Sequence, residues 1–223
     1  FIAGWLALTS IVFYSIWDYQ NLLPLFGSIL LNFIFGYKIS QEQRKNKKIA
    51  LFIVAIIFNV VLLGHYKYSN FLVSMFNPDP FMAEKLLLAE IPLGISFFTF
   101  TQIAFLVDTY RGKCREYNLV NYILFVTYFP HLIAGPIIHH KEMMPQFMKL
   151  AKQAFKWENI SLGTSLFMIG LFKKVIIADF FVVSVQGIFS QSGESISFLN
   201  AWFGTLSYTM QIYFDFSGYS DMA

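Results

Sequence analysis

The chain has 223 residues, of which 57% are hydrophobic, 19% aromatic and 13% charged. Soluble domains carry about 25% charged residues, and 27 phenylalanines are hard to place in one water-soluble core, whereas acyl chains accommodate them at a lipid-facing surface. The net charge is +3, but the basic residues are confined to a few loops and lack the pattern of a nucleic-acid-binding face. Composition therefore predicts a membrane protein with no nucleic-acid partner.

Apolar stretches define about six spans or partial spans, because a helix needs about 20 largely apolar residues to cross a bilayer. The most uniformly apolar stretch, Ile49 to Gly64, contains Asn59 as its only strongly polar side chain. We expect an all-α, polytopic transmembrane protein in which residues 1–223 form a single transmembrane domain, cut at both ends. The expected spans are Phe1 to Trp17, Asn21 to Tyr37, Ile49 to Tyr66, Ile91 to Val107, Ser161 to Phe189 with an interruption, and Leu199 to Phe216.

Loop charges predict the orientation of these spans. Residues 38–48 and 111–116 are rich in Lys and Arg, whereas residues 67–90 carry both signs. Cytoplasmic loops of membrane proteins carry an excess of Lys and Arg. Both basic loops are therefore expected in the cytoplasm, and the two crossings between them agree in parity.

The stretch from Leu119 to Ile138 breaks this pattern, because a full crossing would place the lysines that follow it outside. It contains two prolines and a glycine, and proline removes a helical hydrogen bond. Non-helical backbone at membrane depth is tolerated only against protein or a water-filled cavity. We expect residues 122–138 to form a Pro/Gly-broken re-entrant segment that returns to the cytoplasm, with His131 beside a cavity. The basic residues that follow are Lys141, Lys149, Lys152 and Lys156.

Charged side chains within apolar stretches are informative, since a charge at the bilayer centre costs about 2.5–3.5 kcal/mol on insertion scales. Lys173 and Lys174 allow two interpretations. Their ammonium groups reach the cytoplasmic interface from a helix end, or they line a site together with Asp179. Asp179 is not three or four residues from either lysine, so a same-helix ion pair is not expected.

A second polar group lies near the end of the chain. At about 100° per residue, Gln211, Asp215 and Gly218 share one helix face, and Gly218 allows a neighbouring backbone to approach closely. Two interpretations stay open for Gln211, Asp215, Ser217 and Asp221. They form hydrogen bonds between helices, or they line a funnel or substrate chamber.

The histidines and the single cysteine give weaker signals. His131 lies in the Pro/Gly-broken segment, which makes it either a structural residue or a third chamber candidate. His139 and His140 are interpreted as solvated loop residues. Cys114 can form neither an internal disulfide nor a cysteine-based metal site, and no metal site is expected. From the residues alone, an intramembrane enzyme and a transporter with charged residues along a solute path both remain open.

Several motifs carry a resemblance to a known family. They are IPLGISFFTF at residues 91–100, VDTYRG at 107–112, the segment 129–136, KKV with Ala178-Asp179 at 173–179, and YFDFSGYSDMA at 213–223. In this order and spacing the chain resembles the membrane-bound O-acyltransferases, in particular the alginate O-acetyltransferase branch. The similarity covers about residues 60 to 223, and before residue 50 it is limited to the hydrophobic pattern.

The resemblance implies a ring of helices around a funnel in a multi-pass protein of the bacterial cytoplasmic (inner) membrane. It implies transfer of an acyl group, usually acetyl, from a cytoplasmic donor such as acetyl-CoA or an acylated carrier. The acceptor is a hydroxyl of an extracytoplasmic polysaccharide or cell-wall polymer, and alginate, another exopolysaccharide, peptidoglycan and teichoic acid are open. Membrane lipid and a periplasmic or extracellular acetyltransferase partner protein are also implied, without a covalently bound cofactor.

The resemblance assigns no catalytic residue to this chain. The family's catalytic histidine lies in a Trp-His motif downstream of residues 213–223, and the histidines of this chain do not match it. We therefore expect the chain by itself to be inactive, with chamber walls as its contribution. Ser10→Ala, in a stretch without a matched motif, is expected to reduce O-acetylation far less than Asp215→Ala or His131→Ala. The non-matching histidines are His65, His131, His139 and His140.

Overall fold

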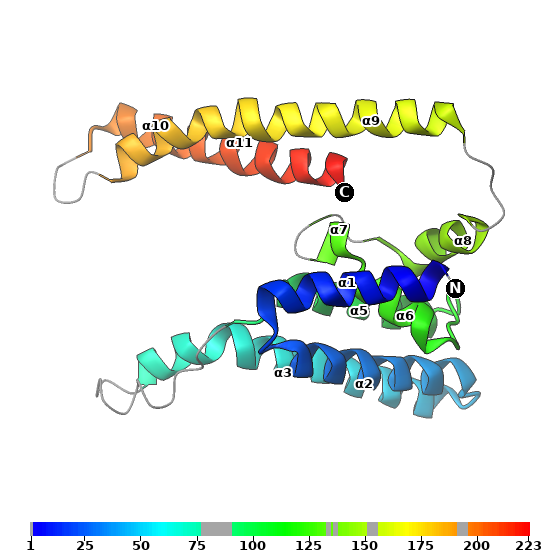
Figure 1. Cartoon of the computed structure of the whole chain (residues 1–223). Coiled ribbons are helices and arrows are strands. Elements are labelled where there is room, and N and C mark those ends of the chain that lie inside the picture. The colour runs from blue at the N-terminus through cyan, green and yellow to red at the C-terminus, as the bar shows by residue number, and fades with distance from the viewer. Residues whose placement is uncertain (1, 77–90, 133–134, 136–137, 151–155, 191–195) are drawn as a thin grey trace. The chain divides into compact units, whose positions relative to one another are not determined.

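The computed structural model describes residues 2–76, 91–132, 135, 138–150, 156–190 and 196–223. Every regular element in these ranges is helical, in agreement with the all-α prediction. The chain divides into two compact units, which we describe separately: unit 1 holds helices α1 to α8 and unit 2 holds α9 to α11 (Figure 1). The assignment of residues 1–223 to a single transmembrane domain stays a prediction.

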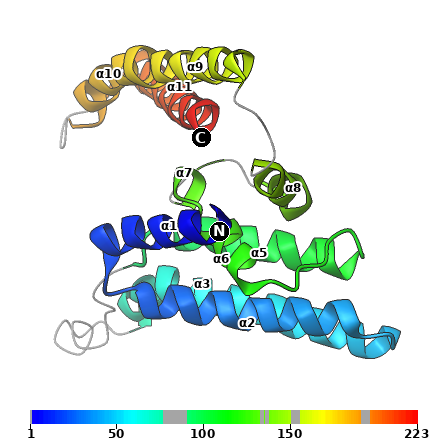
Figure 2. The same ribbon diagram turned by 45° about the vertical axis from the view of Figure 1, so that its right-hand side comes forward.

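Unit 1 contains the two helices that are long and apolar enough to cross a membrane among the described residues. They are α2, with a mean hydropathy of 1.6, and the Lys45–Phe71 part of α3, with a mean hydropathy of 2.4. Figures 1 and 2 show these two helices side by side. The helices of unit 1 are α1 (Ile2–Asp18), α2 (Leu22–Gln41), α3 (Lys45–Phe76), α5 (Ile95–Tyr110), α6 (Leu119–Thr127), α7 (Phe129–Leu132) and α8 (His140–Leu150).

One boundary differs from the sequence expectation. Helix α3 continues to Phe76, ten residues beyond the predicted end at Tyr66, so the first part of the expected outer loop is helical. The residues after Tyr66 contain no proline or glycine before Pro78, and nothing in the local sequence therefore stops the helix earlier.

A buried polar network joins four helices in the core of unit 1. The Asn32 and Asn59 amides exchange two hydrogen bonds between α2 and α3, at 3.1 and 2.6 Å. Gln102 of α5 donates to the Ser28 hydroxyl at 2.9 Å and accepts from the Tyr122 hydroxyl of α6 at 3.3 Å. Side-chain amides that bond across helices hold membrane helices together where lipid supplies no hydrophobic driving force. Asn59, the only strongly polar residue of the apolar stretch in α3, therefore forms an interhelical contact.

The two basic loops lie at the same end of unit 1. The Lys48 ammonium lies 5.5 Å from the centre of the Tyr110 ring, and the Phe52 ring stacks on that ring at 4.6 Å. The start of α3, which follows the first basic loop, is thus beside the end of α5, which precedes the second. A shared membrane side for both loops requires this arrangement, and their cytoplasmic location stays a prediction.

The expected break in the segment 122–138 occurs, but at Tyr128. Helix α6 ends at Thr127, Tyr128 leaves the helical region with φ −55° and ψ 111°, and α7 restarts at Phe129. Pro130 therefore falls in the first turn of a new helix, where a missing N–H has no cost. The return of the segment to the cytoplasm depends on residues 133, 134, 136 and 137, which lie outside the described residues, so it stays a prediction.

Ser10, the comparison position for Asp215 and His131, has structural contacts of its own, and the smaller effect expected of Ser10→Ala stays a prediction. Its side chain is fully buried, and its hydroxyl donates to the Leu6 carbonyl at 2.8 Å. The same hydroxyl accepts from the Phe129 N–H at 3.4 Å. Ser10 thus links α1 to the start of α7, beside the break, which a search for family motifs does not reveal.

Unit 2 is a helical hairpin. A continuous helical stretch consists of α9 (Trp157–Leu171), the π-helix η1 (Phe172–Ala178) and α10 (Asp179–Phe189), and α11 (Phe198–Met222) runs back along all three (Figure 1). The interruption expected within Ser161 to Phe189 is thus a π-helical segment, in which the helix does not end. Large apolar side chains cover the outside of the hairpin, among them Val183 and Leu199, as lipid-facing helices require.

Candidate functional site

The two polar groups that the sequence analysis treated separately form one cluster in unit 2. The Lys173 ammonium donates to the Asp221 carboxylate at 2.6 Å and to the Ser217 hydroxyl at 3.1 Å. The Lys174 ammonium forms an ion pair with Asp215. Both ion pairs connect η1 with α11, so each lysine is neutralised by a carboxylate of the opposite helix.

The π-helix explains why two consecutive lysines both reach α11. Its hydrogen bonds join residues five apart, as between the Asp179 N–H and the Lys174 carbonyl, and the wider turn reduces the angle between neighbouring side chains. The lysines lie inside a continuous helical stretch, so the interpretation of a helix end is wrong, and the location of their ammonium groups at the membrane interface stays a prediction. Asp179 is exposed and takes part in none of the ion pairs found among the described residues.

Two glycines set the distance between the paired helices. A Cβ atom on Gly218 would lie 2.7 Å from the Gly170 carbonyl oxygen and 2.9 Å from the Lys174 nitrogen. A Cβ atom on Gly170 would in turn lie 2.6 Å from the Gly218 carbonyl oxygen. The prediction that a backbone approaches Gly218 closely is confirmed, and this approach brings the ammonium groups within reach of their carboxylates.

Helix α11 also carries two polar atoms with unused hydrogen-bonding capacity. The Gln211 Oε1 and Ser220 Oγ atoms are buried without a hydrogen-bond partner among the described residues. The Asp221 and Asp215 side chains are still 32% and 48% exposed. An unpaired buried polar group costs about 1–3 kcal/mol, so an incoming donor at this place would be stabilised.

His131 belongs to unit 1, whereas the other chamber candidates belong to unit 2. Its imidazole is buried, with Nε2 3.3 Å from the Phe125 carbonyl oxygen and the Tyr128 ring at 5.4 Å. The Nδ1 atom has no hydrogen-bond partner among the described residues. His131 is therefore fixed at one nitrogen and open at the other.

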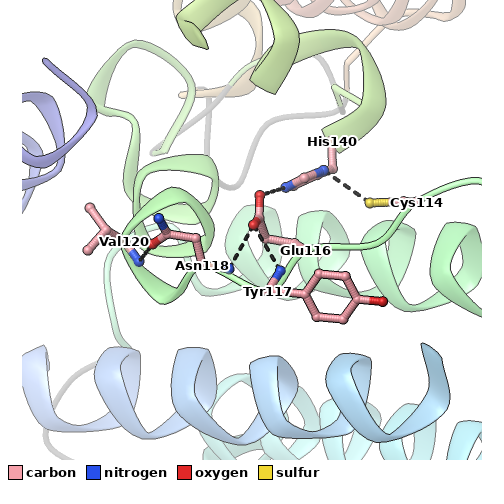
Figure 3. Close-up of polar contacts among 6 residues, drawn as sticks. All are labelled: Cys114, Glu116, Tyr117, Asn118, Val120 and His140. Atoms are coloured by element: carbon pink, nitrogen blue, oxygen red, sulfur yellow. Dashed lines mark hydrogen bonds and ion pairs between the residues drawn. The ribbon is translucent and has the colours of Figure 1, made fainter. Parts of the chain in front are cut away.

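The expectation of solvated loop histidines is confirmed for His139, which is exposed and lies outside a helix, and is wrong for His140. His140 is buried, with 5% exposure, and contacts Cys114 and Glu116 (Figure 3). The half-exposed His139 lies with its Nδ1 2.7 Å from the buried Asp108 carboxylate. These partners are 24 to 31 positions away in the sequence. The one local signal is the spacing of Cys114 and Glu116, which lets both side chains face the same side of the chain and so contact the same residue.

The end of α5 explains how Cys114 and Glu116 reach His140 at the start of α8. Gly112 has φ 72°, and the N–H groups of Gly112 and Lys113 bond to the Thr109 and Asp108 carbonyls at 3.0 and 2.8 Å. This is the hydrogen-bond pattern of a Schellman motif, which requires a left-handed residue that glycine adopts without strain. The chain therefore turns sharply after α5.

Comparison with known proteins decides the family. Residues 95–223, more than half of the chain, match the family model of the membrane-bound O-acyltransferases. The chain belongs to this family. The membrane nature and the acyltransferase resemblance expected from the motifs are thereby confirmed.

Individual relatives extend the similarity to nearly the whole chain. The chain is 43% identical to a peptidoglycan O-acetyltransferase of Helicobacter pylori, over 98% of the chain and 46% of that protein. It is 35% identical to a probable alginate O-acetylase AlgI of Pseudomonas aeruginosa, over 98% of the chain and 42% of that protein. A teichoic acid D-alanyltransferase of Streptococcus thermophilus is 20% identical, over 96% of the chain and 46% of that protein.

These alignments correct the extent of the resemblance. The segment before residue 50, in which the sequence analysis found only a hydrophobic pattern, lies within the aligned 98% of the chain. The chain spans less than half the length of these relatives.

Proposed function

We propose that the whole protein is an O-acetyltransferase of the bacterial cytoplasmic membrane. It moves an acetyl group from a cytoplasmic donor, acetyl-CoA or an acylated carrier, to hydroxyls of an extracytoplasmic polymer. The observation that carries this proposal is the similarity along nearly the whole chain to proteins named for O-acetylation of peptidoglycan and alginate. The higher identity, 43% against 35%, favours peptidoglycan as the acceptor. The same similarity favours the transferase over a transporter.

The polar cluster of unit 2 suits a place in the wall of the transfer chamber. Acyl transfer to a hydroxyl needs a base that removes the proton and donors that stabilise the developing oxyanion. Lysine ammonium groups and a serine hydroxyl are such donors, and the half-exposed carboxylates leave the cluster accessible. We assign Lys173, Lys174, Asp215, Ser217 and Asp221 to this wall. None of these residues of the wall is assigned a catalytic role.

His131 is the candidate of unit 1. Its buried Nδ1 without a partner can bond to a substrate hydroxyl or to a water molecule. We propose that the broken segment that carries it is re-entrant and lines a funnel formed by a ring of helices. The multi-pass topology with cytoplasmic basic loops and a partner protein on the outer side are parts of the same proposal.

Ester analysis of cell-surface polymers tests the proposed function. The gene for the full-length protein is deleted and restored, and acetate released by mild alkali is measured from purified peptidoglycan and from exopolysaccharide. We expect the loss and recovery of acetate in the peptidoglycan fraction. Unchanged acetate in every polymer would refute the transferase, and a change confined to exopolysaccharide would refute the choice of acceptor.

Matched carboxylate variants test the site. Asp215→Asn removes the charge that neutralises Lys174, whereas Asp179→Asn alters an exposed carboxylate outside the ion pairs. We expect normal membrane insertion of both variants and loss of acetylation in Asp215→Asn alone. If acetylation falls only in proportion to the amount of inserted protein, the cluster is structural.

A further inference from the structure

Three side chains of unit 1 form a linear arrangement between the end of α5 and the start of α8 (Figure 3). The Cys114 Sγ atom lies 3.0 Å from His140 Nδ1. The other ring nitrogen, Nε2, lies 3.1 Å from Glu116 Oε2, an ion-pair distance whose angle does not meet hydrogen-bond geometry. The imidazole thus stands between a thiol and a carboxylate. This is the order of nucleophile, base and orienting group that activates nucleophiles in covalent catalysis.

The base and the orienting group are both held in place. The His140 ring is buried and packs against the Phe125 and Phe105 rings, with centroid distances of 4.9 and 5.4 Å. The second Glu116 oxygen, Oε1, accepts hydrogen bonds from the next two backbone N–H groups at 2.9 and 2.8 Å (Figure 3). Such a pre-oriented pair does not have to reorganise when the thiol reacts.

A pocket of about 300 Å³ is lined by Cys114, Glu116 and His140 among other residues. Its lining combines three basic residues with an apolar patch and the three side chains described above. Basic side chains favour phosphate groups, and the apolar patch suits a short acyl chain. The remaining lining residues are Lys113, Arg115, Lys141, Met144 and Pro145.

We propose that Cys114 accepts the acyl group from a thioester donor that bears phosphate groups, and that this S-acyl cysteine precedes transfer to the hydroxyl acceptor. The proposal rests on the proposed function and adds a covalent step to it. Sγ attacks the thioester carbonyl carbon while the S–H proton passes to His140 Nδ1. The carbon–sulfur bond of the donor then breaks, and the leaving sulfur takes the proton from His140. The products are S-acyl Cys114 and the free donor thiol.

The protonation states agree with this order of events. Burial, with a further contribution from the Glu116 and Asp108 carboxylates, raises the pKa of the Cys114 thiol to about 12, so the resting thiol is neutral and needs a base during attack. Burial also opposes the charge on Glu116. Its contact with His140 and its backbone hydrogen bonds outweigh that effect and hold the pKa of the carboxyl below its ordinary value of 4.5. Glu116 is therefore charged and stabilises the imidazolium that forms.

The test uses the full-length protein in detergent and acetyl-CoA with a radiolabelled acetyl group, without polymer. After an acid quench, we expect a label that neutral hydroxylamine releases and that mass spectrometry locates on the Cys114 peptide. When peptidoglycan is added, the label should leave the protein and appear in the polymer. A label that stays on Cys114 while the polymer is acetylated would overturn the proposal.

Variants separate the roles of the three groups. Cys114→Ser keeps the size and the hydrogen bond to His140, so it should insert normally, yet it should lose the hydroxylamine-sensitive label and polymer acetylation. His140→Gln should slow labelling by about 10²- to 10⁴-fold, the usual contribution of a general base. Arg115→Ala should raise the donor concentration needed for half-maximal labelling. Lys149→Ala, an exposed charge of α8 outside the cavity, should leave labelling unchanged.

The outcomes for the two proposals are distinct. Wild-type rates of polymer acetylation in Cys114→Ser, or acetylation by the wild type without a labelled thiol, would overturn the covalent step and leave the proposed function standing. Unchanged acetate in every polymer after deletion of the gene would overturn the proposed function instead. Thiol labelling is measured before polymer is added, so its result is independent of the acceptor.

Discussion

The close approach of α11 to α9 and η1 makes Gly218→Ala the sharpest test of unit 2. The new methyl group would lie 2.7 Å from the Gly170 carbonyl oxygen and 2.9 Å from the Lys174 nitrogen. Both are backbone atoms that cannot rotate away, so the helices have to separate. Overpacking of this kind costs about 1–3 kcal/mol, whereas replacing glycine by alanine in a helix returns about 1 kcal/mol.

A matched control removes the helix-propensity term. Gly163 also lies within a helix, α9, and nothing lies within 4 Å of a Cβ atom placed there. Gly163→Ala should therefore stabilise the protein by about 1 kcal/mol, and the two variants should differ by about 1–3 kcal/mol. This difference in free energy should appear as a lower unfolding midpoint of Gly218→Ala than of Gly163→Ala.

The assay is thermal unfolding of the full-length protein in detergent, followed by acetylation of the polymer. We expect Gly218→Ala to unfold at a lower temperature than Gly163→Ala and to acetylate more slowly, because separation of the helices moves the ammonium groups of η1 away from α11. Equal stabilisation by both substitutions would refute the close contact. A lower midpoint with unchanged acetylation would refute the link between this contact and the chamber.

The remaining predictions concern unit 1. Asn59→Leu removes the donor to the buried Asn32 Oδ1 atom, while the Asn32 NH2 group keeps its bond to the Ser28 carbonyl. The change should cost about 1–3 kcal/mol, and replacing both asparagines by leucine should recover most of the loss; thermal unfolding of the single and double variants decides this. An impermeant thiol reagent should not label Lys149→Cys in intact cells but should label it in inside-out vesicles, and ready labelling in intact cells would contradict the re-entrant segment. His131→Ala should insert normally and lose acetylation, unlike the exposed His65→Ala, and equal activity of the two would exclude His131 from the chamber.

Local patterns in the sequence predicted the helices and one contact surface. Uninterrupted apolar runs identified α2 and α3, because helix formation and lipid exposure depend on neighbouring residues alone. The same holds for Gly218: its place on the face of Gln211 and Asp215 follows from helical periodicity, and the close backbone approach follows from the missing side chain. These features could be read without knowledge of the tertiary structure.

The partners of the polar residues could not be read in this way. Lys173 bonds to Asp221, 48 positions away, and its orientation depends on a π-helix for which the sequence offers no local signal. His140 was interpreted as solvated because its neighbours His139 and Lys141 are polar. Its burial results from Phe105 and the distant residues that surround it. Periodicity identifies a face, but the residue opposite that face is a property of the packing.

The amide network of unit 1 and the charged cluster of unit 2 differ in their exposure to solvent, and this difference distinguishes a structural contact from a candidate site. The Asn32 and Asn59 amides are fully buried, and each satisfies the other, so this pair has no capacity for a ligand and acts as an interhelical contact. The charged cluster of unit 2 is half-exposed and lies on the helix that carries the unpaired Gln211 oxygen. Charges in a membrane protein are costly unless they are paired, and a pair that also stays open to solvent retains the ability to bind a donor or an acceptor. Burial with complete pairing therefore marks the first network as structural, and the accessibility of its ion pairs marks the second as the place to test for acyl transfer.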